Sequence, residues 1–494
     1  MKRFLILLFL AIAGCSKDSD PVTPPPTPIV KYTLTVTAGE GGSVNSSGGQ
    51  YDKGTTVSVT ATPNSGYLFQ GWSDGNTDNP RTLEVSSNLS ITAVFACNMF
   101  EPSQINLTTS HYKRHFVPFD DFYKKLNLDW RYLLLARGYL NINGNEIPDQ
   151  VISSTKWPGE EKGSLFILID NTVVQKVDDF QVHSRKLLVS DFNSDGIDDV
   201  FILDQGLDQS PNFGGGNNQK LLLFDQNGGY NEINFPELGI LHGGASGDID
   251  NDGDVDIIAV NNKGPEYKFI NDGNGNFSVQ NLFPGRDLQE YFTAELYDVN
   301  SDGNLDLIIG GHEWIKDDFL EKNIDFGGVY QNLIFWGNGT GNFDPSNFLM
   351  LPEVPDWGTI ADFDFYDLDF DGTEELIVNR TGGNKFAGMD NEGDMENGFY
   401  ENYYIQILKK EGESFIEFSN IISPENWPKL HWLDWLDIYD LDGDCLPDIV
   451  PDDQEINYTQ SVEYSQYRPG DLDGFKRIYF KGDGGGGFTF STYN

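Results

Sequence analysis

The stretch GDIDNDGDVDIIAV, residues 247–260, places acidic side chains at short, regular intervals and then runs into apolar sequence. The acids fall at positions 1, 3, 5 and 9 of a loop: Asp248, Asp250, Asp252 and Asp256. Gly253 occupies position 6, where a tight loop favours a residue without a Cβ atom. Carboxylates this close repel one another unless a cation lies between them, and calcium accepts oxygen ligands at such flexible spacing. The stretch therefore predicts a calcium-binding loop.

The residues after the loop indicate that strands, not helices, flank it. An EF-hand needs a bidentate Glu at position 12 and a helix on each side. Position 12 here is Ala259. The acid at position 9 instead opens DIIAV, a β-branched and apolar run that is typical of a buried strand. We therefore expect a calcium loop at a β-turn.

Four further loops repeat this spacing together with the apolar run. The predicted metal ligands of the five loops are Asp191, Asn193, Asp195 and Asp199; Asp248, Asp250, Asp252 and Asp256; Asp298, Asn300, Asp302 and Asp306; Asp367, Asp369, Asp371 and Glu375; and Asp440, Asp442, Asp444 and Asp448. They predict about five calcium sites. Cys445 takes the glycine position of the last loop, so we expect that loop to be strained or differently shaped.

A sixth loop, NINGNEIPDQVI, keeps the spacing with amides in place of most acids. Its residues at the four ligand positions are Asn141, Asn143, Asn145 and Asp149. With one carboxylate, it is expected to bind calcium weakly or not at all.

The loops mark out a repeat. Their last acids recur about every 50 to 70 residues, which indicates a repeat architecture. Each unit reads strand, calcium loop, strand, long loop, strand, Gly/Asn turn, strand, as in RKLLVSD, DVFILD, KLLLFD, QNGG and YNEINF. Four antiparallel strands repeated radially form a β-propeller blade. We predict an all-β chain with a propeller of six four-stranded blades, preceded by a small β domain; seven blades remain the alternative, because residues 98–125 leave room for a degenerate one.

Two family resemblances follow from these motifs. The loops, with their continuations LLLFDQNGGY, FINDGNGNF and IFWGNGTGNF, resemble FG-GAP/VCBS repeats over residues 125–494. That family includes the integrin alpha-subunit propeller, and the resemblance implies a calcium-stabilised propeller. Residues 31–97 carry KYTLTVTA and TTVSVTAT, which alternate with period two, and resemble the B-repeat of internalin-like bacterial surface proteins. There we expect Trp72 to be a core residue and the domain to act as a spacer, joined to the propeller by a connecting segment, 98–124.

The N-terminus resembles a bacterial lipoprotein signal. MKRFLILLFLAIAGC has a basic start, an apolar core too short to span a membrane, and small residues before a cysteine. The resemblance implies a signal peptide over residues 1–14 and a lipidated Cys15; an ordinary secretory signal is the alternative. Residues 15–30 form a proline-rich linker, expected to be extended. Ser16, followed by acids, is similar to surface-exported lipoproteins of the Bacteroidetes type, so we expect a lipid-anchored protein exposed on the cell outer membrane.

The net charge limits the classes of binding partner, and the cysteines raise the question of a disulfide. The chain has 32 basic and 77 acidic residues, a formal net charge of −45 and a pI near 4.2. This field disfavours nucleic acid and anionic lipid, so we expect membrane contact through the lipid anchor only. Cys97 and Cys445 either form a disulfide, which would join the start of the propeller to its last unit, or remain separate thiols. The sequence leaves the oligomeric state open.

The sequence indicates the function of the protein less clearly than its fold. No nucleophile elbow, zinc signature or phosphate loop occurs in the sequence. His312 and Glu313 are the best pair for proton transfer, although a polar loop packed on its neighbours is the favoured interpretation.

The long loops between the second and third strands should lie on the face opposite the calcium loops. Their candidate ligand-binding residues are Trp157, His312, Trp314, Arg380 and Tyr464, with Phe399, Tyr400, Tyr458 and Tyr467 nearby. We expect this face to bind a protein or polysaccharide partner at the cell surface. The alternative is a polysaccharide-processing, lyase-like enzyme with a Tyr or His base in the same loops.

Overall fold

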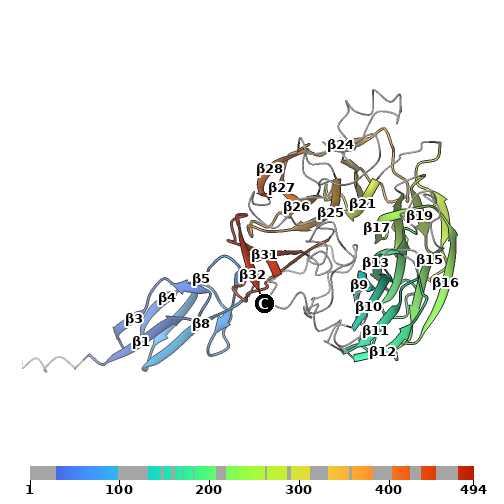
Figure 1. The fold of residues 1–494 in the computed structure, drawn as a ribbon. Helices are drawn as coiled ribbons and strands as arrows, with labels where there is room; N and C mark the ends of the chain where they lie inside the picture. The colour runs from blue at the N-terminus through green and yellow to red at the C-terminus, as the bar shows by residue number, and fades with distance from the viewer. Residues whose placement is uncertain are drawn as a thin grey trace, which may run out of the picture. The chain divides into compact units, whose positions relative to one another are not determined.

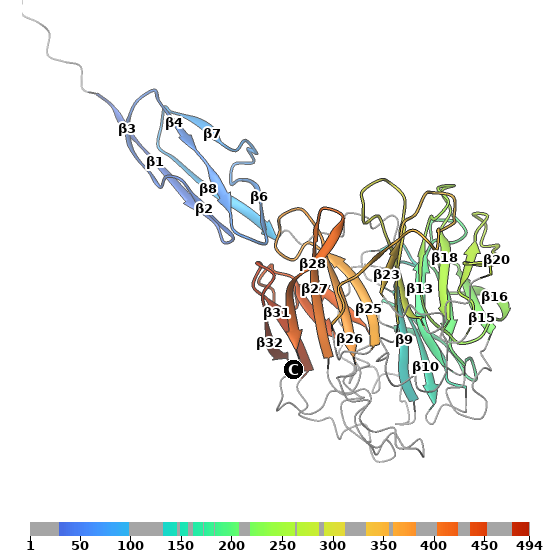
Figure 2. The same cartoon turned by 90° about the horizontal axis from the view of Figure 1, so that it is seen from above.

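The computed structural model describes residues 29–97, 132–145, 149–156, 162–170, 172–181, 183–206, 218–261, 264–285, 291–311, 332–354, 359–381, 403–422, 435–451 and 477–493 (Figure 1, Figure 2). Within these ranges the regular elements are all β-strands, and accordingly no membrane-spanning helix is found among them. The all-β prediction is confirmed for this part of the chain. Two compact units are present: the described residues up to Asn64 with Leu68–Ala96, and Ser65–Tyr67 with the chain from Cys97 onward.

The first unit contains eight strands around a small core. Their bounds are β1 (Lys31–Ala38), β2 (Gly42–Val44), β3 (Gly48–Asp52), β4 (Thr55–Val59), β5 (Ala61–Pro63), β6 (Tyr67–Trp72), β7 (Arg81–Val85) and β8 (Leu89–Cys97). One sheet has the order β3-β1-β8-β6, and the pairs β2-β5 and β4-β7 complete the unit. Trp72 is 2 % exposed, and its Nε1 donates a hydrogen bond to the carbonyl of Asp78 at 2.9 Å. The prediction that Trp72 is a core residue is therefore confirmed.

The described residues of the second unit form six four-stranded antiparallel sheets, each built from four strands that follow one another in sequence. The first three sheets are β9 (Tyr132–Leu140), β10 (Asp149–Lys156), β11 (Leu165–Ile169) and β12 (Thr172–Val177); β13 (Ser184–Ser190), β14 (Asp199–Asp204), β15 (Asn218–Phe224) and β16 (Tyr230–Glu237); and β17 (Leu241–Gly247), β18 (Asp256–Asn261), β19 (Tyr267–Ile270) and β20 (Ser278–Asn281). The last three are β21 (Tyr291–Tyr297), β22 (Asp306–Gly311), β23 (Leu333–Phe335) and β24 (Phe348–Met350); β25 (Thr359–Tyr366), β26 (Glu375–Thr381), β27 (Tyr403–Glu411) and β28 (Ser414–Ile422); and β29 (Leu436–Tyr439), β30 (Asp448–Pro451), β31 (Arg477–Gly482) and β32 (Phe488–Tyr493). Each predicted calcium loop joins the first and second strands of its sheet.

Apolar clusters lie between consecutive sheets and hold the unit together. The second and third sheets, for example, bury Phe201, Leu241 and Ile257 in one cluster, and four similar clusters join the other consecutive pairs. The first strand of each sheet packs against the first strand of the next, and the fourth strand lies at the outer edge (Figure 1). Because both faces of an inner strand are covered, β14, β18 and β22 are buried along their whole length. This burial explains the apolar runs VFIL, IIAV and LII that follow the first acid of each strand.

A disulfide joins Cys97 to Cys445, with their Cα atoms 5.1 Å apart. The structure thus selects the paired state from the two alternatives that the sequence left open. Both cysteines belong to the second unit, and they lie 348 residues apart in sequence.

Candidate metal centres

The loop at residues 248–256 is shaped by its own first carboxylate. Asp248 accepts two backbone hydrogen bonds, from the amide of Asp252 at 3.2 Å and from the amide of Gly253 at 2.9 Å. Asn251 and Gly253 have positive φ angles of 59° and 98°. A Cβ atom at Gly253 would meet no other atom, so the left-handed backbone, not lack of space, favours glycine there.

The loop that contains Cys445 keeps this shape. Asp440 accepts hydrogen bonds from the amides of Asp444 and Cys445 at 3.0 and 2.9 Å, as Asp248 does in its loop. Cys445 takes a φ of 66°, a left-handed conformation that costs about 1–2 kcal/mol for a residue with a Cβ atom. Of the two expectations for this loop, strain is confirmed and a different shape is not observed.

The acid at position 9 has a second role that the sequence did not reveal. Asp256 is fully buried and accepts hydrogen bonds from the amide of Ile249 at 3.2 Å and from the amide of Asn271, at the end of the third strand, at 2.8 Å. Burial raises the pKa of Asp256 to about 7. The carboxylate therefore fastens the loop to the third strand, whether or not it also binds metal.

The same arrangement recurs in the other sheets. Burial raises the pKa of four equivalent acids, to about 7 for Asp199, Asp306 and Glu375 and to about 6 for Asp448. In the amide-rich loop, Asp149 accepts hydrogen bonds from the amides of Ile142 and Asp170 at 2.8 and 3.0 Å. Asp149 is the one carboxylate at the four ligand positions of this loop, and it is also the residue with this structural role. The sequence signal for the role was therefore available: the acid at position 9 is retained where the other acids are replaced by asparagine.

The donors of the 248–256 loop suit a calcium ion. Carboxylate oxygens of Asp248, Asp250 and Asp256 lie within 4.8 Å of one another. Oδ1 of Asp250 is buried and has no hydrogen-bond partner. Burial, and then the charges of Asp252 and Asp248, raise the pKa of Asp250. A hard divalent cation would satisfy the buried oxygen and offset the repulsion, so these residues fit the ion that the spacing predicts.

The loops at 191–199 and 298–306 have the same framework with an amide at position 3. Asp191 accepts hydrogen bonds from the amides of Asp195 and Gly196 at 3.0 and 2.8 Å. In the other loop Asp298 accepts the equivalent bonds from Asp302 and Gly303 at 3.0 and 2.8 Å. Amide and carboxylate oxygens are both calcium ligands, so these two loops also fit the ion.

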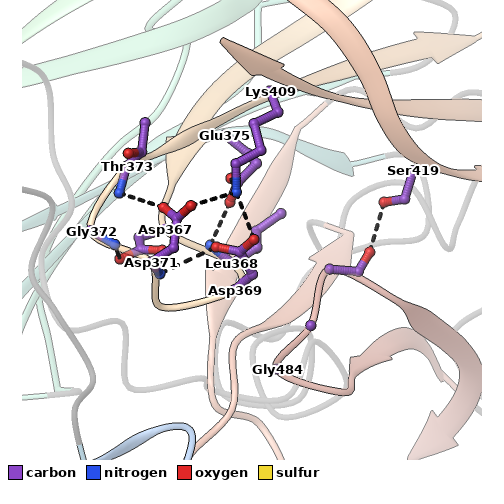
Figure 3. Close-up of polar contacts among 12 residues, drawn as sticks. Asp367, Leu368, Asp369, Asp371, Gly372, Thr373, Glu375, Lys409, Ser419 and Gly484 are labelled. Atoms are coloured by element: carbon purple, nitrogen blue, oxygen red, sulfur yellow. Dashed lines mark hydrogen bonds and ion pairs between the residues drawn. The ribbon is translucent and has the colours of Figure 1, made fainter. Parts of the chain in front are cut away.

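Two loops already contain a cation from the chain itself. Lys409 of β27 places its Nζ 2.7 Å from carboxylate oxygens of both Asp369 and Asp371 and 3.2 Å from Oε1 of Glu375 (Figure 3). In the last sheet Lys481 of β31 forms ion pairs with Asp442 and Asp444, the latter at 2.7 Å. Acids of these two loops also lie close enough together to hold a metal ion, at Asp367, Asp369 and Asp371 and at Asp440, Asp442 and Asp448, but here a lysine already lies among them.

Most residues of the predicted ligand face lie outside the described residues. They are Trp157, His312, Trp314 and Tyr464, together with Phe399, Tyr400, Tyr458 and Tyr467. Arg380 is described, and its assignment to a loop is wrong. It lies in β26, fully buried, and donates hydrogen bonds to Gln406 Oε1 at 3.0 Å and to the carbonyl of Pro352 at 3.1 Å. The strand continues one residue beyond it, to Thr381, so its side chain serves the packing of the sheet.

Charged groups also lie close together where the first strands converge, and no sequence pattern indicated this. The guanidinium carbon of Arg185 lies 5.8 Å from the ring centres of both Phe292 and Trp435. Oδ2 of Asp362 accepts a hydrogen bond from the amide of Leu436 at 3.0 Å. These contacts bring together residues on or beside β13, β21, β25 and β29.

Two family models match parts of the chain. Residues 32–99 match the divergent InlB B-repeat domain, and residues 248–309 match the FG-GAP-like repeat. Both resemblances predicted from the motifs are thereby confirmed. No curated protein matches the chain. The fold and the matches together define a class, an all-β repeat protein of the kind found in surface and adhesion proteins.

Proposed function

We propose that residues 125–494 form a six-bladed β-propeller that is stabilised by calcium and displayed on the cell surface to bind a partner. The contacts among first strands support the ring. Arg185 belongs to the second sheet, yet its side chain lies against Trp435, which directly precedes the sixth, and against Phe292 of the fourth. First strands of sheets that are not consecutive meet when sheets are arranged radially about one axis.

The buried, unpartnered Oδ1 of Asp250 is the observation that carries the calcium proposal. Unsatisfied buried oxygens are rare in folded proteins, and this one lies beside the carboxylates of Asp248 and Asp256. We assign calcium to this loop and to the loops at 191–199 and 298–306. Ion binding to the folded state alone adds stability of about 2.7 kcal/mol per site at a hundredfold excess over Kd.

Thermal unfolding with and without a chelator tests the calcium proposal. We expect excess chelator to lower the Tm and added calcium to restore it. Asp248→Asn should shrink this difference, because it removes a ligand charge. Asp272→Asn is the matched control, since Asp272 lies in the β19–β20 turn and its carboxylate accepts hydrogen bonds from Asn274 and Asn276. An identical melting curve in chelator and in calcium would rule the proposal out.

Surface anchorage is proposed from the lipoprotein-like N-terminus, and the B-repeat match supports a surface protein. We propose that the partner, a protein or a polysaccharide, binds the loops between second and third strands. The net charge of −45 favours a neutral or cationic partner, or an anionic one bridged by calcium. Arrays of glycans and of surface proteins, probed with the full-length chain, test this. Binding that survives combined alanine substitution of Trp157, Trp314 and Tyr464 would place the partner elsewhere.

The polysaccharide-processing alternative depends on loops outside the described residues, and the structure adds no observation in its favour. It predicts new double-bond absorbance when the protein is incubated with uronic-acid polysaccharides. Absence of that absorbance across a panel of such substrates would leave binding as the function to pursue.

A further inference from the structure

One position on the third strand distinguishes the last two sheets from the others. Lys409 follows Leu408, which pairs with the residue after Glu375. Lys481 follows Phe480, which pairs with the residue after Asp448. The equivalent residues of the other four sheets are all apolar: Ile169, Leu223, Ile270 and Trp336. The register therefore brings a lysine to the calcium loop in two sheets only.

Both lysines point their ammonium groups at the predicted ligands. Lys409 contacts the carboxylates at positions 3, 5 and 9 of its loop, and its side chain is 22 % exposed (Figure 3). Its ammonium also lies 4.9 Å from the ring centre of Phe418 on β28. Lys481 contacts the acids at positions 3 and 5, and Tyr479 donates a further hydrogen bond to Asp442 at 3.2 Å. Lys409 thus binds three, and Lys481 two, of the four acids that a calcium ion would need.

The lysine of the third sheet behaves differently. Lys268 lies two residues before Ile270, the equivalent position, and pairs with Ile258. Asp250 and Asp256 act on it only through their charges. Its Nζ donates hydrogen bonds to the carbonyl of Gly341 at 2.6 Å and to Asn342 Oδ1 at 3.0 Å. It leaves Oδ1 of Asp250 without a partner. Nearby lysine alone is therefore insufficient, and the strand register decides whether the ammonium enters the loop.

We propose that Lys409 and Lys481 are internal cations that take the place of calcium in the loops at 367–375 and 440–448. Each lysine forms ion pairs with the acids at positions 3 and 5 of its loop and repels a second cation from the same position. These two loops then keep their shape without calcium. Dependence on calcium is confined to the loops at 191–199, 248–256 and 298–306, which reduces the five sites expected from spacing to three. This inference rests on the proposed calcium binding by those three loops.

Calcium bound per chain, measured by equilibrium dialysis of the full-length protein, tests the assignment through matched variants. Asp248→Asn should lose one calcium ion, whereas Asp367→Asn, at the same position of a lysine-containing loop, should lose none. If both lose one, the lysine proposal is overturned while the calcium proposal stands. If neither loses one, calcium binding by these loops fails, and the lysine proposal fails with it.

Exchanging the lysine gives the complementary test. Lys409→Met should gain one calcium ion and show a larger fall in Tm on chelation, because the loop's acids lose their internal cation. Lys220→Met is the control, since Lys220 of β15 forms its ion pair with Glu232 on the neighbouring strand. Should Lys409→Met not fold, Ile270→Lys offers the reverse change and should lose one ion. Unchanged calcium content in the folded exchange variants would overturn the proposal.

Discussion

Asp149 provides the cleanest measure of what the position 9 acid contributes to folding. It is fully buried, and its two oxygens accept hydrogen bonds from the amides of Ile142 and Asp170. Asp149→Ala leaves the buried amide of Ile142 without this acceptor, at about 1–3 kcal/mol, and removes the part-buried hydrogen bonds from the amides of Asn143 and Asp170, at about 0.5–1.5 kcal/mol each. We therefore expect the free energy of unfolding to fall by about 2–6 kcal/mol, the sum over these three bonds.

Urea unfolding followed by tryptophan fluorescence, in excess chelator and in excess calcium, measures this loss. The fall should be equal in the two conditions, because the other ligand positions of this loop are amides. Asn145→Ala is the control: its exposed side chain makes a hydrogen bond to Asp170 at 2.7 Å, so its removal should cost less than about 1 kcal/mol. A loss for Asp149→Ala no larger than the control, or one that calcium abolishes, would refute the structural role.

Three further predictions concern other parts of the chain. Burial raises the pKa of Asp362 to about 7 despite the nearby charge of Lys186, so its contribution to stability is full below about pH 4 and is lost as pH rises through 7. Asp362→Asn should remove most of this loss, and Tm measured from pH 4 to pH 8 should fall less in the variant than in the parent protein. Replacing Cys97 and Cys445 together by Ser should lower stability by up to about 5 kcal/mol, since the bond closes a long loop; equal Tm values for the variant and the oxidised protein would contradict this. Cys15→Ala should release the protein from the membrane fraction, and its retention there would show that another feature anchors it.

Much of the fold could be predicted from the sequence because it depends on residues that lie close together in the chain. The five acidic loops are short, and their shape depends on hydrogen bonds between residues two to five apart, such as Asp248 with Gly253. Each loop is followed by a strand that is buried on both faces, and an apolar run such as DIIAV predicts such a strand. Interactions of this range leave their pattern within one stretch of sequence, so the units, their four strands and Trp72 in the first core were predictable.

Contacts between residues far apart in the sequence could be identified only from the tertiary structure. Lys409 meets Asp369 across 40 residues, through the register of β26 with β27, two strands that residues 382–402 separate in sequence. The same limit applies to Arg380, because the point at which β26 ends depends on its pairing with β27 and not on its own residues.

The sequence alone therefore determined the repeat, the loop chemistry and the two family resemblances, since each rests on residues adjacent or nearly adjacent in the chain. Only the tertiary structure decided that Cys97 pairs with Cys445, that the position 9 acids fasten the third strands, and that Lys409 and Lys481 enter two of the loops. The physical reason is that strand register is set by the packing of whole sheets against one another. A one-residue shift in that register would turn each lysine to the opposite face of its sheet, away from the carboxylates.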